Sequence, residues 1–465
     1  MRRTPMTMAA LALPLLLAAC SSVGELQNDA HRQMIQKLGR PAEPVGMTEI
    51  SAPGTLRACY ELALKRSPSV QGTALTIEER KIAVEQARRV VVPRFSVRAT
   101  ASPKVYSKDD LTDPLSGGVY LSFDFQKALL HDQQTRSSLA AAAIAEEERR
   151  HAEHGVAAEL IESVAGAILL RQEVAFLDAE VEMQREGLAA AETVAGIGME
   201  TADPLFWRTN LEDADERALT ASRDLRSAET QLTLMLGTGV PGPEMETELG
   251  AWLAREKEGQ PGHPAVANLV GLAWTCRPDV RIAGLRSVMA ADQVTIAKWS
   301  LIQSADLSFG AGHIENPRSE GYVRFLPVLN LELPLFDAGD FRRRVALARL
   351  QSRRSDLDIE RVARNLPLEL GARLAEVDSQ STVLEHATRA VADTDRILPS
   401  GEYGGLRRLE QKIFAARVRG RECASRLAWI HAWVRLKLSL GLNPLTATGL
   451  AVPPALPGDP PRDNP

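Results

Sequence analysis

Apolar residues alternate with polar ones along two stretches of the chain, and each stretch then changes to a helical pattern. In the later stretch the apolar positions recur at alternate residues between Val323 and Leu335, and a charged, Ala-rich pattern follows from Phe341. In the earlier stretch the alternation runs from Val119 to Phe125. A period of two predicts a strand, and apolar residues three or four apart predict an amphipathic helix. Both stretches therefore predict a strand that leads into a long helix.

The two stretches belong to one unit that the chain contains twice. Leu331 follows Leu121 by 210 residues, and the same offset relates Pro68 to Pro278. Spacing shared over so long an interval indicates an internal repeat. We predict a first repeat over residues 55–237 and a second over 265–442, each with a proline-initiated helix, two strands and a helical hairpin. A Gly- and Pro-rich linker over residues 238–264 joins them, with a short helical patch from Glu248 to Glu258.

The helical hairpins dominate the predicted fold. The pattern from Ala128 to Ala195 contains no proline, and at 1.5 Å per residue it predicts a helix on the order of 100 Å long. The second long helix, from Phe341 to Leu398, contains Pro367, which we expect to kink or interrupt it near Asn365. The fold class is therefore mainly α with a small β part.

Each repeat also contains a shorter alternating stretch, Arg94–Ala101 in the first and Leu307–Ala311 in the second. Four strands with one apolar and one polar face are typical of a barrel with lipid outside and water inside. An open sheet edge is not tolerated in lipid, and about eight strands is the usual minimum for closure. Three copies of the chain give twelve strands. The alternative is a set of soluble hairpins that pack on helices.

The N-terminus predicts export. Arg2 and Arg3 precede an apolar core from Met8 to Leu17, and Leu17-Ala18-Ala19-Cys20 follows. This segment resembles a bacterial lipobox, which implies a signal peptide over residues 1–19 and acylation of Cys20. We read residues 20–54 as a lipid-anchored linker and the Pro-rich residues 443–465 as a disordered tail. By the same resemblance, Ser21 favours the outer membrane.

Composition narrows the function. The formal net charge of −5 gives no basic footprint for nucleic acid. After Cys20, three cysteines remain, with no metal-binding spacing between them: Cys59, Cys276 and Cys423. Reduced buried thiols and a Cys59–Cys276 disulfide both stay open. His151 and His154 have a metal-compatible spacing, but no ligand cluster accompanies them, so we predict surface histidines and no metal or other cofactor.

The order of these features resembles the TolC-type outer membrane factors, the exit ducts of bacterial efflux pumps and type I secretion systems. The residues that carry the resemblance are the helix starts Ser67-Pro68-Ser69-Val70 and Arg277-Pro278-Asp279-Val280, the strand-to-helix junction Leu333–Gly339, and the Leu-Gly helix ends at 236–237 and 440–441. The resemblance implies a homotrimer with a 12-stranded barrel in the outer membrane and an α-helical tunnel in the periplasm. It also implies a passive channel rather than an enzyme, which meets a periplasmic adaptor protein and an inner-membrane pump. The exported substrate is left open.

The resemblance places the working residues at the ends of the two hairpins. The residues that match the adaptor-docking stretch are Gly196, Ile197, Gly198, Thr201, Asp203, Leu205, Gly401, Leu406 and Leu409. Acidic residues near the same ends form a candidate ring at the periplasmic entrance: Glu200, Asp203, Asp393, Asp395 and Glu402. The simpler alternative is that these residues only cap and close the hairpins. The alternative for the whole chain is a structural lipoprotein scaffold without a pore, which would not need four alternating strands.

Overall fold

The computed structural model describes residues 54–89, 94–101, 115–196, 203–237, 242–259, 264–300, 304–316, 319–332, 339–397, 405–447 and 450. The chain divides into two compact units, and all of these residues except Gly237 belong to the larger one. The predicted signal peptide, Cys20 and most of the predicted tail lie outside the described residues.

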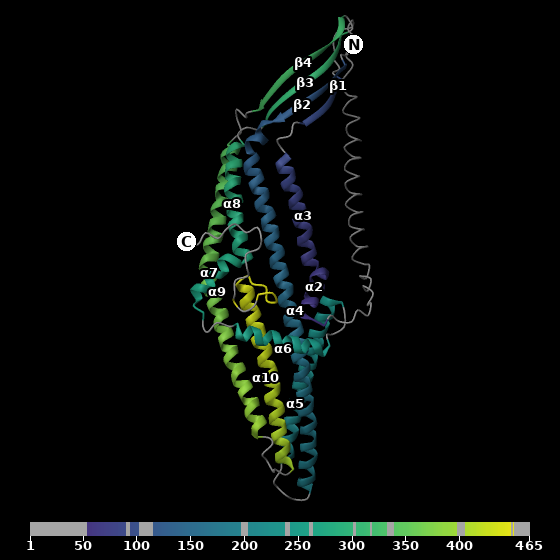
Figure 1. Cartoon of the computed structure of the whole chain (residues 1–465), viewed down its shortest axis with the longest axis vertical. Helices are drawn as coiled ribbons and strands as arrows, with labels where there is room; N and C mark the ends of the chain where they lie inside the picture. Colours follow the sequence, from purple (N-terminus) through teal and green to yellow (C-terminus); the bar gives the residue numbers. More distant parts are fainter. Residues whose placement is uncertain are drawn as a thin grey trace, which may run out of the picture. The chain divides into compact units, whose positions relative to one another are not determined.

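The elements of the larger unit follow one another in the same order twice (Figure 1). The first set is α2 (Leu56–Arg66), α3 (Pro68–Arg88), β1 (Arg94–Ala101), β2 (Leu115–Asp124), α4 (Phe125–Gly196) and α5 (Pro204–Leu236). The second set is α7 (Val266–Cys276), α8 (Pro278–Trp299), β3 (Ser304–Asn316), β4 (Ser319–Glu332), α9 (Asp340–Ile397) and α10 (Leu406–Ser439). The first residues of α7, α8 and β3 follow those of α2, α3 and β1 by the same 210 residues found in the sequence. Between the sets, α6 (Pro243–Glu258) is longer than the helical patch expected there.

The start of α3 differs in detail from the expected cap. Ser67 has an extended backbone, as the residue before a proline favours, and Pro68 takes the first helical position. The Ser67 hydroxyl does not cap the helix, however, because its Oγ lies 2.8 Å from the Oγ of Ser69. At the start of α2, Thr55 does cap: its side chain accepts a hydrogen bond from the Ala58 N–H at 3.2 Å.

The strands form one antiparallel sheet in the order β1-β2-β3-β4, so the β2–β3 pair joins the two repeats. The register sets apolar positions opposite one another: Leu121 pairs with both Phe95 and Phe309, and Leu307 pairs with Leu329. Among the described residues, β1 and β4 each have a partner on one side only.

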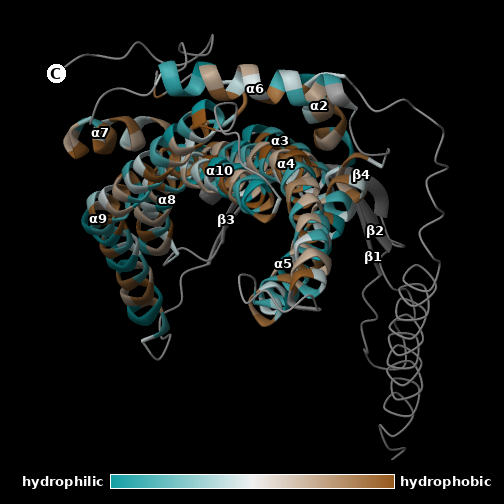
Figure 2. Cartoon of the chain, turned by 90° about the horizontal axis from the view of Figure 1, so that it is seen from below, coloured by the Kyte–Doolittle hydropathy of each residue, from teal (hydrophilic) through white to brown (hydrophobic). Residues whose placement is uncertain are grey.

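The long helices pack side by side and antiparallel. α4 has 72 residues, about 108 Å at the usual rise, and it contacts α3 and α8 along one part of its length and α5 and α10 along another. Seen along its length, the unit shows these helices in an arc, with α9 at one end and α5 at the other (Figure 2). Among the described residues, no helix is both long enough and apolar enough to cross a membrane.

The predicted interruption at Pro367 is absent, because α9 runs continuously from Asp340 to Ile397. Leu366 and Leu370, which flank the proline, are almost fully buried. Packing of these side chains holds the helix through a residue that lacks an N–H donor. They belong to the main apolar core, where α2, α4, α5, α6, α9 and α10 meet. Two smaller clusters lie along the hairpins.

Candidate functional site: the hairpin ends and the helical belt

The first hairpin end lies between α4 and α5. The turn residues, including Ile197, Gly198 and Thr201, lie outside the described residues, and Gly196 is the last residue of α4. Asp203 is exposed, and its Oδ1 accepts a hydrogen bond from the Leu205 N–H at 2.9 Å. This is an N-cap, the simpler of the two roles expected for Asp203.

A tryptophan that the sequence analysis did not select anchors this end. Trp207 of α5 is 3% exposed, and its ring lies where a side chain at Gly187 of α4 would have to be. Phe206 meets the Trp207 ring edge to face, with ring centroids 6.0 Å apart. Both Leu205 and Phe206 are left exposed. The signal in the sequence is a lone glycine in a helix opposite a bulky aromatic residue on its partner.

The second hairpin end packs against the first. Gly405, with a φ of 58° that favours glycine, precedes α10. Leu406 and Leu409 are half-buried against the cluster of Ala191, Trp207 and Ile413, so these two predicted docking residues face the first hairpin. Gly401 lies outside the described residues.

The predicted acidic residues each have a local partner where they are described. Asp395 of α9 forms an ion pair with Arg419 of α10 at 2.7 Å, and Asp393 lies 3.7 Å from Arg396. Glu200 and Glu402 lie outside the described residues. These exposed pairs contribute little to stability. The carboxylates at this end are therefore partly neutralised within one chain.

Further along the hairpins, a buried carboxylate connects three helices. Glu180 of α4 is fully buried and accepts hydrogen bonds from Arg217 of α5 at 2.9 Å and from Arg417 of α10 at 2.6 Å. Burial alone would lower the pKa of Arg217, but the hydrogen bonds and charges of Glu180 and Asp213 raise it above its ordinary value. Both arginines therefore stay charged, and Glu180 holds the two hairpins together.

A belt formed by α6 crosses the long helices at the level of the main core (Figure 1). Near its start, Glu248 accepts a hydrogen bond from the Leu56 N–H at 2.7 Å, at the beginning of α2. Near its end, Glu256 accepts one from Trp433 Nε1 at 2.8 Å and pairs with Lys437 Nζ at 2.6 Å. Lys437 also donates to the Ala447 carbonyl oxygen at 2.6 Å. Burial lowers the pKa of Lys437, and Glu256 opposes that effect.

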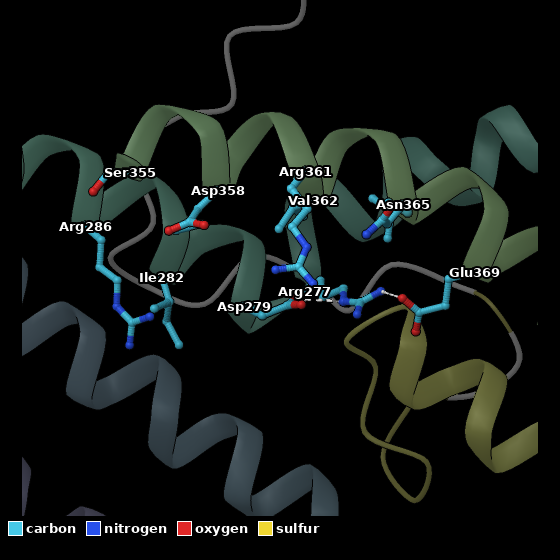
Figure 3. A pocket seen from close by; sticks show the side chains of 12 residues that line it. Arg277, Asp279, Ile282, Arg286, Ser355, Asp358, Arg361, Val362, Asn365 and Glu369 are labelled. Carbon is cyan, nitrogen blue, oxygen red and sulfur yellow. Dashed lines mark hydrogen bonds and ion pairs between the residues drawn. The ribbon is translucent and has the colours of Figure 1, made fainter. Parts of the chain in front are cut away.

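A cavity of about 610 Å³ lies between α8 and α9 (Figure 3). Its charged side chains are paired with one another: Arg277 donates to Glu369 at 2.9 Å and to Asp279 at 2.8 Å. Arg277 Nη1 also donates to the Ser439 carbonyl oxygen at 3.2 Å, at the end of α10. The contacts therefore fix where the second repeat's helices meet, and they include no nucleophile with an adjacent base.

The histidines and cysteines have structural environments. His151 is exposed, whereas His154 is half-buried, and burial, followed by the charges of His151 and Arg150, lowers its pKa to about 4. Within the described ranges no group of three His, Cys, Asp or Glu side chains could hold a metal ion. Cys59 and Cys423 are buried, Cys276 is partly exposed, and none of the three forms a disulfide. The disulfide alternative between Cys59 and Cys276 is therefore excluded.

Comparisons with known proteins agree with this arrangement. Residues 59–238 match the family model described as outer membrane efflux protein. No curated protein sequence matches the chain. Several solved structures do match it. The structure of CusC is 18% identical, with a TM-score of 0.63, and the match covers 87% of this chain and 98% of that one.

Two further structures show the same likeness. A membrane protein from Pseudomonas aeruginosa is 19% identical, with a TM-score of 0.63 and coverage of 86% and 98%. The outer membrane protein VceC from Vibrio cholerae is 15% identical, with a TM-score of 0.61 and coverage of 85% and 97%. At these identities the likeness shows the fold, and it extends over nearly the whole length of the solved chains.

Proposed function

We propose that this chain is an outer membrane efflux channel of the TolC type, in which three copies close one continuous duct. The observation that carries the proposal is that a single chain forms an open wall. Its sheet ends at β1 and β4, and its arc of helices ends at α5 and α9 (Figure 2). A wall with two different edges closes into a ring when one edge of each copy meets the other edge of the next.

The sheet requires such closure in a membrane. Unpaired N–H and C=O groups along β1 and β4 would have no water to bond within lipid. Three copies supply twelve strands, an even number in the usual range for outer membrane barrels. The paired apolar positions, such as Leu121 with Phe309, supply the lipid-facing side. A pore-free scaffold has no use for this sheet.

The proposal is tested by a charge on the lipid-facing side of β4. Leu331 pairs with Ala305, and its neighbour Asn330 pairs with Asp306 on the alternate side. Leu331→Arg should cost about 2–4 kcal/mol near the membrane midplane. We expect it to be depleted from the outer membrane fraction, whereas the matched variant Asn330→Arg assembles. Normal assembly of both variants would show that β4 does not face lipid.

The duct's periplasmic end is the proposed docking surface for an adaptor protein. Support comes from the exposure of Asp203 and Leu205, and from their position beside the turn over residues 197–202. Gly196, Ile197, Gly198 and Thr201 complete this surface, with Gly401 on the second hairpin. Leu406 and Leu409 support it from behind, because they pack between the hairpins. The entrance acids, Glu200 and Glu402 with Asp203, Asp393 and Asp395, line its mouth.

A photo-reactive residue at position 197 tests the docking surface in cells. We expect cross-links to a periplasmic protein with a helical hairpin, identified by mass spectrometry, and none from the same residue at position 148, far along α4. Cross-links only to other copies of this chain would overturn the docking proposal and leave the duct unaffected.

Cys20 is the proposed lipid anchor, on the strength of the residues before it. Cells grown with labelled fatty acid should incorporate label into the wild-type chain and not into the Cys20→Ser variant. Equal labelling of both chains would place the lipid elsewhere.

A further inference from the structure

A continuous apolar stripe follows the edge helix α9 from end to end. Its exposed large apolar side chains lie seven, 11, 15 and 14 residues apart, all close to whole numbers of helical turns, so they share one face. They are Leu350, Leu357, Leu368, Val383 and Ile397. Isolated exposed apolar residues are ordinary, but a stripe along about 70 Å of helix indicates a covered surface.

The opposite edge of the wall carries the matching stripe. Leu205, Leu219 and Leu234 of α5 are exposed, and they are separated by 14 and 15 residues. Read in the opposite direction, Ile397, Val383 and Leu368 of α9 are separated by the same 14 and 15 residues. The exposed fractions of these six side chains range from 46% to 79%. α5 leaves the hairpin end and α9 approaches it, so the two stripes are antiparallel.

The two stripes also lie at matching levels. Leu205 is the second residue of α5 and Ile397 is the last of α9, so both border a hairpin turn. At the other end, Leu234 lies between Leu232 and Leu236, which belong to the main core. Leu368 lies between Leu366 and Leu370, which belong to the same core. The stripes therefore agree in spacing, direction and level.

We infer that α5 of one copy packs against α9 of the next in a fixed antiparallel register. Leu205 then faces Ile397 of the next copy, Leu219 faces Val383, and Leu234 faces Leu368. The inference rests on the proposed trimeric duct and names the seam that closes it. It also assigns Leu205 to a contact between copies, beside the adaptor surface formed by the turn.

Polar residues along the seam are consistent with this register. Glu216 lies 11 residues after Leu205 and His386 lies 11 before Ile397, so the register places an acid opposite an imidazole, and both side chains are exposed in the single chain. Nearer the sheet, Leu75 and Ile82 of α3 are exposed and seven residues apart, as are Leu350 and Leu357 of α9. α3 runs towards the sheet and α9 away from it, so the same antiparallel match extends to this part of the edge.

Cysteine pairs test the register directly, because a disulfide needs Cα atoms about 4.4–6.8 Å apart. Chains with Leu219→Cys and Val383→Cys should form covalent dimers and trimers on mild oxidation, seen in non-reducing gels of the detergent-extracted protein. Chains with Leu205→Cys and Ile397→Cys should do the same. The matched control combines Leu219→Cys with Ile397→Cys, which the register separates by about 21 Å along the helix. The wild-type chain, whose cysteines lie away from the seam, reports background.

The outcomes separate the register from the duct. Cross-linking of both matched pairs without the offset pair supports the seam. A particle of three chains in which the matched pairs stay uncross-linked, or in which the offset pair cross-links, overturns the register and leaves the duct standing. A particle of one chain overturns both.

Discussion

The buried pair of Lys437 and Glu256 offers the sharpest test of how the helical belt is held. Lys437 Nζ is 2.6 Å from Glu256 Oε2, and the two side chains are 0% and 4% exposed. Glu256→Gln keeps an acceptor for Trp433 Nε1, which now lies 2.8 Å from the carboxylate, and removes only the countercharge. Lys437→Met removes the other charge and leaves the carboxylate buried.

The magnitude follows from the burial of both groups. A buried charge that loses its partner destabilises a protein by about 3–5 kcal/mol, so each single variant should lose about that much free energy of unfolding. The double variant has no unpaired charge, so its loss should be well below the sum of the two, with a coupling of about 3–5 kcal/mol. The stacked rings of Trp429 and Trp433, with centroids 5.7 Å apart, report the transition through their fluorescence.

The assay is guanidinium unfolding of the detergent-extracted protein, followed by tryptophan fluorescence. Arg389→Met is the matched control, because its pair with Glu385 is 71% and 63% exposed, and it should change stability by less than about 0.5 kcal/mol. In Glu256→Gln, burial still lowers the pKa of Lys437 from 10.5 but nothing acidic opposes it. The unfolded chain then binds the proton more tightly, so stability should rise with pH towards 10.5. Single variants that behave like Arg389→Met would refute the reasoning.

Three further predictions concern the hairpins and the titratable groups. Gly187→Ala would collide with the Trp207 ring and should cost about 1–3 kcal/mol, whereas Gly155→Ala, which meets no atom within 4 Å, should gain up to about 1 kcal/mol; equal effects in unfolding experiments would contradict the packing. Burial raises the pKa of both buried cysteines to about 11, so iodoacetamide at pH 8 should modify Cys276 first, as peptide mass spectrometry would show. The lowered pKa of His154, about 4 against 6.5, means that the unfolded chain takes up a proton first as pH falls from 6.5; stability should fall over that window in the wild-type chain and less in His154→Leu.

Much of the fold follows from periodicity. The offset that relates Leu121 to Leu331 also relates the first residues of helices and strands in the two repeats. Alternation located the strands because a pleated backbone exposes successive residues on opposite sides. The prediction for Pro367 was wrong, because local propensity is overridden when neighbouring leucines are fixed in a core.

The contacts that hold the wall could not be read from the sequence. Glu180, Arg217 and Arg417 look like ordinary solvated helix residues, and they meet only because three helices converge. The same holds for Glu256 and Lys437, which lie on different helices and look equally ordinary in the sequence. Pairings between distant helices depend on their relative rotation and level, which periodicity along one chain does not determine. The stripes of α5 and α9 became comparable only once their levels were known.

The central claim, that open walls close into a three-chain duct, is tested most directly by native mass. The protein is extracted from outer membranes in mild detergent, and the mass of the particle is measured with bound detergent removed in the gas phase. The account predicts three chains of 50.6 kDa each before processing of the N-terminus. A particle of one chain would leave the edges of β1 and β4 unpaired within lipid, and would contradict it.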